Sequence, residues 1–300
     1  MSDSGDFDKE RWKRKIVIHT KITWITTVIF IAITGLILGF SVIRRSKNTD
    51  LITQVSEDVP NSDAAGIYTT SGITESDKKT DVPVNDETGT EARHQIYLTF
   101  DDGPSSMTED ILDILKEYDV KATFFVLGRE DEYALRMYKR IVDEGHTLGM
   151  HSYSHKYADI YKDEEAFLAD LERIQNLLYD ATGVWPRFYR FPGGSSNRVS
   201  SVGMQVYANL LNQNGITYFD WNIASGDAVS GTVPRETIVR NCTAGIDKYD
   251  QCVILLHDAT MRKTSVTALP EIIQILQDRG DCEFLPITDE TPPVQHAIRK

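Results

Sequence analysis

The pattern of apolar and polar positions divides the chain into three parts. Residues 22–43 form an apolar run, rich in Ile, Val, Leu and Phe, that contains no ionisable side chain. Residues 46–93 are rich in Ser, Thr, Asp and Glu and have no sustained apolar period. From residue 94 onward, short β-rich runs alternate with amphipathic stretches. The sequence therefore predicts a membrane-spanning helix, a solvated spacer and a folded body, in that order.

The apolar run has the length and the flanks of a membrane anchor. About 20 apolar residues span a hydrocarbon core of roughly 30 Å, and basic residues are concentrated before residue 22. By the positive-inside tendency, we expect a cytoplasmic basic segment over 1–21, a single-pass anchor over 22–43 and export of everything beyond it. A cleaved signal peptide is the main alternative, but the run exceeds the usual core of about 7–15 residues and no A-x-A site follows. A buried helix is disfavoured because the segment has no polar face.

Residues 44–93 are predicted to be an extracytoplasmic linker. Their polar composition, with scattered Gly and Pro, is typical of a chain that remains solvated. An extended linker would let the folded body reach surfaces on the order of tens of Å from the bilayer. A spacer with no specific role remains the default interpretation.

Residues 94–300 are predicted to form one α/β domain. Repeated alternation of strands and helices is typical of a mainly parallel sheet, open or closed into a barrel. In either form, chemistry collects at the carboxyl ends of the strands. The runs with the composition of strands are 95–100, 120–127, 146–149, 187–190, 216–219, 251–256 and 283–286.

The stretches between these strands carry helix start and stop signals. Ser106 with Glu109 predicts a capping box that opens a helix over 106–118. Three glycines each stand where a helix would end before the next strand, namely Gly145, Gly215 and Gly280. These signals support the alternation that the apolar pattern indicates.

The charge balance narrows the classes of partner. The chain has 45 Asp and Glu against 32 Lys and Arg, a formal net charge of −13, and the acidic excess lies beyond residue 45. An acidic body repels a polyphosphate backbone, so we expect no nucleic-acid partner and a neutral substrate is easier to accept. The composition, 41% hydrophobic and 26% charged, excludes a collagen-like or wholly disordered chain.

Two adjacent carboxylates end the first predicted strand. Asp101 and Asp102 follow Thr99-Phe100 and precede a Gly-Pro turn. Successive side chains of a strand point in different directions, so one carboxylate can bind a metal while the other faces a substrate. The alternative is a loop acid pair whose oxygens accept backbone amides.

Two histidines follow another predicted strand. His151 and His155 are four residues apart and can point at one ion from a single helical turn or a compact loop. Two His ligands and one carboxylate leave open positions on a metal for water and substrate. Two polar surface groups are the alternative, but the strand before His151 puts it on the same rim as Asp102.

Three further signals follow predicted strands. Arg190, before a Pro-Gly-Gly turn that contains Gly193, can pair with a carboxylate, and glycines let backbone N–H groups approach a ligand. Asp220-Trp221 follows a strand, and His257 follows a continuous apolar run where it can act as a general acid. Each signal could be structural in isolation. Because all five stand at the carboxyl ends of different predicted strands, the sequence predicts one metal-dependent active site.

The order and spelling of these motifs closely resemble the polysaccharide deacetylases of carbohydrate esterase family 4, the group with the NodB homology domain. The resemblance covers about residues 94–290 and depends on TFDDGP, HSYSH, RFPGG, DW and LLHD in that order. It implies a distorted (β/α) barrel over 94–300. It also implies that the protein removes an acetyl group from the nitrogen of an N-acetylhexosamine, or from oxygen in some members.

The resemblance implies a role for each matching residue around the metal. Asp102, His151 and His155 resemble the family's metal ligands, usually for Zn²⁺ or Co²⁺, and we expect Zn²⁺ as the cofactor. Asp101 resembles the general base, and Arg190 resembles the partner that tunes it.

On the other side of the implied site, His257 resembles the general acid and Asp220 the residue that orients it. Trp221 and Leu255 resemble the walls around the acetyl methyl group. A backbone N–H near Gly193 is expected to stabilise the tetrahedral oxyanion. Many family members have Tyr where this chain has Gly193, so the aromatic wall at that position is missing.

Two other patterns leave alternatives open. A bridge between Cys242 and Cys252 and unpaired thiols, Cys282 included, are both compatible with the sequence, and none is assigned to the metal. Tyr residues recur every four positions from Tyr153 to Tyr161. A packed helix or loop edge is favoured there over a sugar-stacking face.

These interpretations combine into a bacterial, membrane-anchored, metal-dependent deacetylase that faces the cell wall. We expect peptidoglycan N-acetylglucosamine as the substrate, with poly-N-acetylglucosamine, chitin oligomers, N-acetylmuramic acid and O-acetylated xylan as alternatives. The expected partners are the polysaccharide and the lipid bilayer. A non-catalytic glycan-binding protein is disfavoured because Asp101 and the other motif residues are all present. A metallopeptidase or phosphoesterase is disfavoured because no H-E-x-x-H motif or phosphate-binding Gly loop is found.

Overall fold

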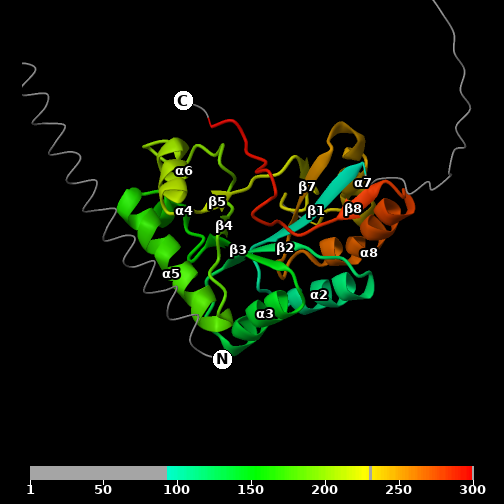
Figure 1. Cartoon of the computed structure of the whole chain (residues 1–300), viewed down its shortest axis with the longest axis horizontal. Helices are drawn as coiled ribbons and strands as arrows, with labels where there is room; N and C mark the ends of the chain where they lie inside the picture. The colour runs from blue at the N-terminus through cyan, green and yellow to red at the C-terminus, as the bar shows by residue number, and fades with distance from the viewer. Residues whose placement is uncertain (1–92, 230–231, 299–300) are drawn as a thin grey trace, which may run out of the picture. The chain divides into compact units, whose positions relative to one another are not determined.

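The structure is a computed structural model that describes residues 93–229 and 232–298 (Figure 1). The predicted cytoplasmic segment and anchor lie outside these residues, as does the linker except for Arg93. Among the helices of 93–229 and 232–298, none combines the length and the apolar character that a membrane span requires.

The body is built on a curled parallel sheet that remains open. The strand order is β5-β4-β3-β2-β1-β7-β6, with β8 added beside β1, and every pair is parallel. The outermost strands β5 and β6 do not pair, so the sheet is a half-barrel, which agrees with the distorted barrel expected from the sequence. The strands are β1 (His94–Asp101), β2 (Thr123–Leu127), β3 (Thr147–Ser152), β4 (Phe188–Tyr189), β5 (Thr217–Tyr218), β6 (Ile223–Ala224), β7 (Gln251–His257) and β8 (Cys282–Phe284).

Helices cover the outer side of the sheet. In Figure 1, α5, α3, α2 and α8 follow one another along that side. Gly145, Gly215 and Gly280 all have positive φ just beyond a helix end, which confirms the predicted stops. The helices are α2 (Thr108–Glu117), α3 (Glu132–Asp143), α4 (Tyr157–Ile160), α5 (Glu164–Thr182), α6 (Met204–Gln213), α7 (Arg235–Thr243) and α8 (Lys263–Asp278), with a 3-10 turn η1 (Ile246–Lys248).

The predicted capping box of α2 is wrong. The helix begins at Thr108, and its N-cap residue makes no side-chain capping bond. Instead, the Ser105 backbone N–H donates to Thr108 Oγ1 at 2.8 Å, and Thr108 Oγ1 lies 2.6 Å from Asp258 Oδ2. Asp258 follows β7, so a tertiary hydrogen bond fixes the start of the helix, and local spacing could not reveal it.

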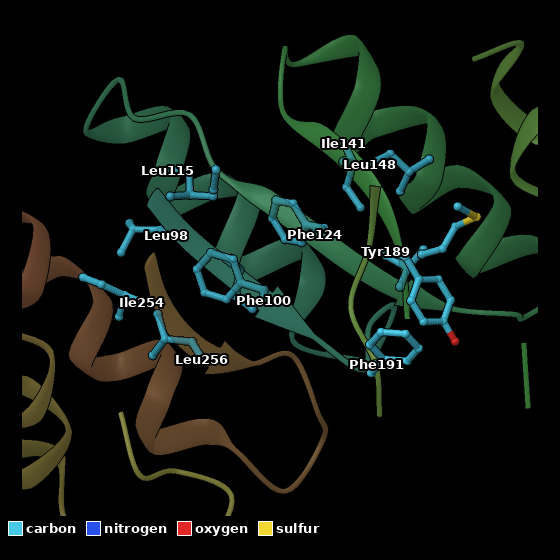
Figure 2. Close-up of a cluster of buried hydrophobic side chains, with 14 of the residues drawn as sticks. Leu98, Phe100, Leu115, Phe124, Ile141, Leu148, Tyr189, Phe191, Ile254 and Leu256 are labelled. Carbon is cyan, nitrogen blue, oxygen red and sulfur yellow. The ribbon is translucent and has the colours of Figure 1, made fainter. Parts of the chain in front are cut away.

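Alternation along the strands separates two apolar clusters. On the outer face, even-numbered residues of β1 and β7, such as Leu98, Phe100, Ile254 and Leu256, pack beneath the helices (Figure 2). On the inner face a smaller cluster contains Tyr97, Phe125, Phe219, Val253 and Ile287. The inner face therefore has an apolar floor, and the polar residues at the strand ends lie beyond it.

The same alternation brings two titratable residues together at the carboxyl ends of β1 and β7. Asp101 and His257 are the last residues of these strands and are register partners. They share the inner face with Tyr97 and Val253, because each lies an even number of residues from them. Strand pairing alone thus places a carboxylate beside an imidazole.

Candidate active site

Asp101 forms the ion pair with Arg190 that the sequence predicts. Arg190 Nη1 donates to Asp101 Oδ1 at 2.9 Å and to Thr99 Oγ1 at 2.6 Å. Within the described chain, Asp101 Oδ2 accepts no hydrogen bond, and His151 Nε2 lies 3.9 Å from it. One carboxylate oxygen is therefore anchored, while the other remains available.

The Arg190 guanidinium is completely buried, and each of its three nitrogens donates a hydrogen bond. Its Nε donates to the Phe219 carbonyl at 3.0 Å and its Nη2 to the Asp220 carbonyl at 2.8 Å. The Phe125 ring lies beneath it at 4.3 Å. Because a guanidinium has a fixed planar array of donors, these bonds leave Arg190 one orientation and fix Asp101 with it.

Asp102, His151 and His155 come together as a group that could hold a metal ion. One ligand atom from each lies within 4.8 Å of the others. Asp102 Oδ1 is 3.6 Å from His151 Nε2 and 3.3 Å from His155 Nε2. The same Asp102 oxygen is buried and has no hydrogen-bond donor. A buried carboxylate oxygen without a donor is costly, so this donor set fits a cation that binds all three residues.

Local backbone irregularities aim these ligands. Asp102 and His155 have backbone φ angles of 75° and 54°, which residues other than Gly rarely adopt. On β3, Met150 and Ser152 pair with consecutive residues of β2, so His151 is the extra residue of a β-bulge. Each ligand is thus turned out of the regular strand or loop direction toward the common point.

Hydrogen bonds behind the ligands set their orientation. His151 Nδ1 lies 2.7 Å from the Arg190 carbonyl, which can only accept, so Nδ1 carries the proton and Nε2 keeps its lone pair. The His155 backbone N–H donates to Ser152 Oγ at 2.8 Å. Burial and the neighbouring His151 lower the pKa of His155 despite the charge of Asp102. The neutral form, which is the form that binds a metal, is therefore favoured.

His257 is paired with Asp227, a residue that the sequence analysis did not single out. His257 Nδ1 donates to Asp227 Oδ1 at 2.7 Å, and Asp227 Oδ2 accepts from the His257 backbone N–H at 3.0 Å and from Ser265 Oγ at 2.7 Å. Burial acts to lower the pKa of His257, but the hydrogen bond and charge of Asp227 outweigh it, and the pKa is raised. The imidazolium form is therefore stabilised at this position.

Asp220 does not orient His257, contrary to the sequence expectation. Its Oδ1 accepts from the Ser195 backbone N–H at 2.8 Å, and its Oδ2 accepts from Ser195 Oγ and, at 2.7 Å, from the His296 backbone N–H. Both oxygens are occupied by the loop after β4 and by the C-terminal segment. Asp220 therefore joins these two segments, and Asp227 occupies the position expected for Asp220.

Leu255 lies on the same strand as His257, and Trp221 lies against the loop after β4. Leu255 is buried two residues before His257 and shares its face of β7. His296 packs edge-on against the Trp221 ring, with centroids 4.8 Å apart, and its Nε2 lies 2.7 Å from the Trp221 carbonyl. A methyl group added at Gly194 would lie 3.0 Å from Trp221 Cη2, so the ring lies against the backbone of this loop.

Gly193 occupies the turn after Arg190 with a φ of 77°. Its backbone N–H donates to no acceptor among the described residues. This is the arrangement that an oxyanion donor requires, because the N–H is not already committed to the protein.

Three residues near the site carried no separate signal in the sequence analysis. Asp227 stands in a loop after the two-residue strand β6, where no apolar run marks a strand end. His296 lies near the C-terminus, beyond the last predicted strand. Asp258 is buried, accepts from Ser105 Oγ at 2.6 Å and has a pKa that burial raises to about 6. Adjacency to His257 is the only sequence signal that could have drawn attention to it.

The cysteine alternative is settled for the described residues. Cys242, Cys252 and Cys282 are all free thiols, and the first two are buried. Burial raises the pKa of the Cys252 thiol to about 12, which keeps it uncharged. None of the three belongs to the metal group.

Comparisons with known proteins identify relatives of this arrangement. Residues 88–218 match a family model described as polysaccharide deacetylase. The chain is 35% identical over 192 residues to a peptidoglycan-N-acetylglucosamine deacetylase of Bacillus cereus, covering 63% of this chain and 67% of that protein. It is 33% identical over 199 residues to the peptidoglycan-N-acetylglucosamine deacetylase PgdA of Listeria monocytogenes, covering 65% of this chain and 38% of that protein.

Two solved structures agree with these relatives. The catalytic domain of peptidoglycan N-acetylglucosamine deacetylase from Eubacterium rectale is 40% identical, with a TM-score of 0.65, and the match covers 69% of this chain and 94% of that one. The polysaccharide deacetylase Bc1974 from Bacillus cereus is 34% identical, with a TM-score of 0.60, over 68% of this chain and 97% of that one. Both matches extend over most of the solved domain.

Proposed function

Because this chain belongs to the polysaccharide deacetylase family, a group of hydrolases, we propose that it hydrolyses the N-acetyl groups of peptidoglycan N-acetylglucosamine and releases acetate. One observation carries this proposal: an anchored carboxylate, an imidazole paired with a carboxylate and a group of three residues that could hold a metal ion meet at one edge of the sheet. The names of the Bacillus cereus, Listeria monocytogenes and Eubacterium rectale relatives support the choice of glycan.

We assign the metal site to Asp102, His151 and His155, and we propose Zn²⁺ as the ion. When bound, a divalent ion supplies a Lewis acid that polarises the acetyl carbonyl and lowers the pKa of a water molecule. The chain supplies one anionic oxygen and two imidazole nitrogens, which is a donor set suited to zinc with a further position left open. The hydrogen bond from His151 to the Arg190 carbonyl holds the first imidazole in the ligating tautomer.

Asp101 is proposed as the general base. Its Oδ1 is held by Arg190, while Oδ2 lies on the side of His151 and can accept a proton from the attacking water. A base fixed by a buried guanidinium does not have to reorient during the reaction. The N–H of Gly193 is proposed to donate to the oxygen that becomes negatively charged.

His257 is proposed as the general acid. Nδ1 is committed to Asp227, so Nε2 delivers the proton to the nitrogen of the leaving sugar. The pKa of His257 is raised by Asp227 against the effect of burial, which favours the protonated ring that this step requires. Trp221 and Leu255 are proposed as the walls around the acetyl methyl group.

We further propose that the catalytic body works outside a bacterial cell, tethered by residues 44–93 to a membrane anchor at 22–43. The apolar run and its basic flank support this location. Peptidoglycan is a fixed polymer, so an enzyme held near it gains access by the reach of its tether.

The proposal is tested by acetate release. The full-length chain, purified in detergent and loaded with Zn²⁺, is incubated with peptidoglycan, with N-acetylglucosamine oligomers and with acetylated xylan. The Asp101→Asn variant serves as the blank. We expect acetate from peptidoglycan that the blank does not release.

Release from another polymer alone would retain the chemistry and replace the substrate. No release from any polymer by the zinc-loaded chain would contradict the proposal and favour a glycan-binding protein on the same fold.

A further inference from the structure

The loop after β4 contributes two glycines to the site, and each is covered by an aromatic ring from another segment. Gly193 and Gly194 both have a φ of 77°, so neither position readily accepts a side chain. Trp221 lies against Gly194. Tyr157, the first residue of α4, lies against Gly193. The loop therefore presents backbone, and the aromatic walls come from elsewhere.

Tyr157 occupies the space in which a side chain at position 193 would begin. A methyl group added at Gly193 would lie 2.9 Å from the Tyr157 hydroxyl oxygen and 3.1 Å from its Cε1. Both distances are shorter than ordinary van der Waals contacts. The Tyr157 ring and a side chain at 193 thus compete for the same space, and the ring has to shift if position 193 carries a side chain.

Packing fixes the Tyr157 ring between the metal group and Gly193. On one side it meets His155 edge-on, with centroids 5.6 Å apart and planes at 85°. On the other it meets Tyr161 at 5.9 Å, and the buried Tyr161 hydroxyl donates to the Pro192 carbonyl at 2.9 Å. The ring is therefore tied, through Tyr161, to the loop that carries Gly193.

The polar end of Tyr157 is left for a ligand. Among the described residues its hydroxyl makes no hydrogen bond, although the ring is half-buried. By contrast, the hydroxyls of Tyr153 and Tyr161 are both bonded, to Glu130 Oε1 at 2.5 Å and to Pro192. Of the three tyrosines at four-residue spacing, Tyr157 alone combines an unbonded hydroxyl with contact to a metal-binding residue.

We propose that Tyr157 is a specificity-determining residue that contacts the sugar bearing the acetyl group, with its ring against the pyranose and its hydroxyl bonded to a sugar oxygen. This inference depends on the proposed function. An acetyl group bound between the metal group and the Gly193 N–H would lie next to Tyr157, because this ring contacts both His155 and Gly193, and the attached sugar would then be within reach of the ring. The wall that the sequence lacks at position 193 is thereby supplied from α4.

Binding is measured first, in the catalytically blocked Asp101→Asn background of the full-length zinc-loaded chain, with N-acetylglucosamine oligomers in a calorimeter. Adding Tyr157→Ala should weaken binding by about tenfold, the effect of a lost aromatic contact and hydrogen bond. Adding Tyr157→Phe should weaken it by about threefold, because only the hydrogen bond is lost. Adding Tyr153→Phe, the matched control, should leave the affinity unchanged, because its hydroxyl bonds to Glu130.

Turnover measurements distinguish two roles of Tyr157: contact with the sugar and structural support of the metal site. With Asp101 intact, Tyr157→Ala should lower kcat/KM for the oligomers about tenfold, mainly through KM, and leave hydrolysis of a small aryl acetate and the bound zinc unchanged. A parallel loss on the aryl acetate, or loss of zinc, would overturn the inference in favour of a structural role. Unchanged affinity and unchanged kcat/KM in both Tyr157 variants would overturn it as well.

Failure of the proposed function would give a different result. In that case neither the wild-type chain nor any Tyr157 variant releases acetate from a glycan. The binding series in the Asp101→Asn background still reports on Tyr157, since it needs no turnover. An absence of oligomer binding in that background would overturn the inference.

A double-mutant cycle tests the shared space directly. Gly193→Ala should weaken oligomer binding, because the methyl group meets Tyr157 and the backbone conformation is strained. With Tyr157→Ala already present, the further effect of Gly193→Ala should be at least about threefold smaller, because the contact is gone. Strict additivity would contradict the claim that the two positions compete for one space.

Discussion

The site has two sides: the acid side consists of His257, Asp227 and Ser265, and the metal side consists of Asp102, His151 and His155. They differ in whether the polar atoms of the side chains find hydrogen-bond partners within the protein. On the acid side, His257 donates to Asp227, which also accepts from Ser265 and from a backbone amide. On the metal side, Asp102 Oδ1 is buried without a donor, and both Asp102 and His155 have strained backbone angles. The residues around His257 therefore satisfy one another, whereas Asp102 keeps an oxygen, Oδ1, that a cation would satisfy. Under the proposed function, the proton donor is complete once the chain folds, and the ligand group is completed by the ion.

We expect the largest effect on activity when the metal ion is removed or one of its proposed ligands is replaced. Chelation of the ion, or Asp102→Ala, should lower kcat about 10³-fold or more, because the Lewis acid that stabilises the transition-state charge is lost. Added Zn²⁺ should restore the chelated wild type and raise its Tm, but should do neither for Asp102→Ala. Zinc content, kcat and Tm are measured on the same samples. A chelated enzyme that retains full activity would remove the contrast between the two sides.

The next effect separates the base from the ligands beside it. Asp101→Asn should lower kcat about 10²- to 10⁴-fold while zinc remains bound, because the amide cannot accept the proton of the attacking water. Arg190 still has Thr99 and two carbonyls as acceptors, so the fold should persist. The measurements are acetate release and zinc content. Loss of zinc together with activity would mean that Asp101 belongs to the metal side.

The third prediction tests whether Asp227 or Asp220 controls the pKa of the proposed general acid, His257. His257 must be protonated to act, so activity falls as pH rises through its pKa, and the raised pKa extends activity upward. Asp227→Asn removes the charge that raises this pKa, leaves burial to lower it, and should shift the alkaline limit of kcat to lower pH. At neutral pH kcat should fall about tenfold.

Asp220→Asn is the matched control for that prediction. Its carboxylate is as buried as Asp227 but accepts from Ser195 and His296, so the alkaline limit should stay in place. The loss should appear in Tm instead. A shift of the limit in Asp220→Asn, with none in Asp227→Asn, would contradict the assignment.

Asp227 and Asp220 also show which parts of the site can be predicted from the sequence and which cannot. The sequence indicates Asp101, Asp102, His151 and His257 because each stands at or just beyond the end of a predicted strand, and parallel strands bring such ends together. The alternation of β-rich and amphipathic runs predicted the parallel sheet for the same reason. Both features depend on short stretches of sequence that mark strands and helices, and the parallel sheet then brings the marked residues together.

The features that the sequence missed depend on contacts between distant segments. Asp227 follows a strand of only two residues, which has no detectable period. The start of α2 is set by Asp258, 150 residues beyond Thr108. The β-bulge at His151 and the positive φ of Asp102 have no sequence signature of their own. Tertiary hydrogen bonding therefore decided the details that local spacing left open.

We expect the smallest effect from replacing either of two buried serines. Ser265 belongs to the acid side, and Ser195 lies in the loop after β4. Ser265 Oγ donates to Asp227, and Ser195 Oγ donates to Asp220. Replacing either with Ala removes one buried hydrogen bond, so each variant should lose about 1 kcal/mol of unfolding free energy. Denaturant titrations measure this loss.

Only Ser265→Ala should also change the pH profile. Without this donor, the negative charge of Asp227 is less dispersed and acts more strongly on His257, so the pKa of His257 should rise. The alkaline limit of kcat should then move slightly upward, opposite in sign to the shift of Asp227→Asn. Ser195→Ala should leave it in place, because the described hydrogen bonds of the Asp220 carboxylate go to Ser195 and His296 and not to His257. Equal profiles for the two serine variants would show that Ser265 supports Asp227 only structurally, and opposite signs for Ser265→Ala and Asp227→Asn would establish that the charge of Asp227 controls the acid.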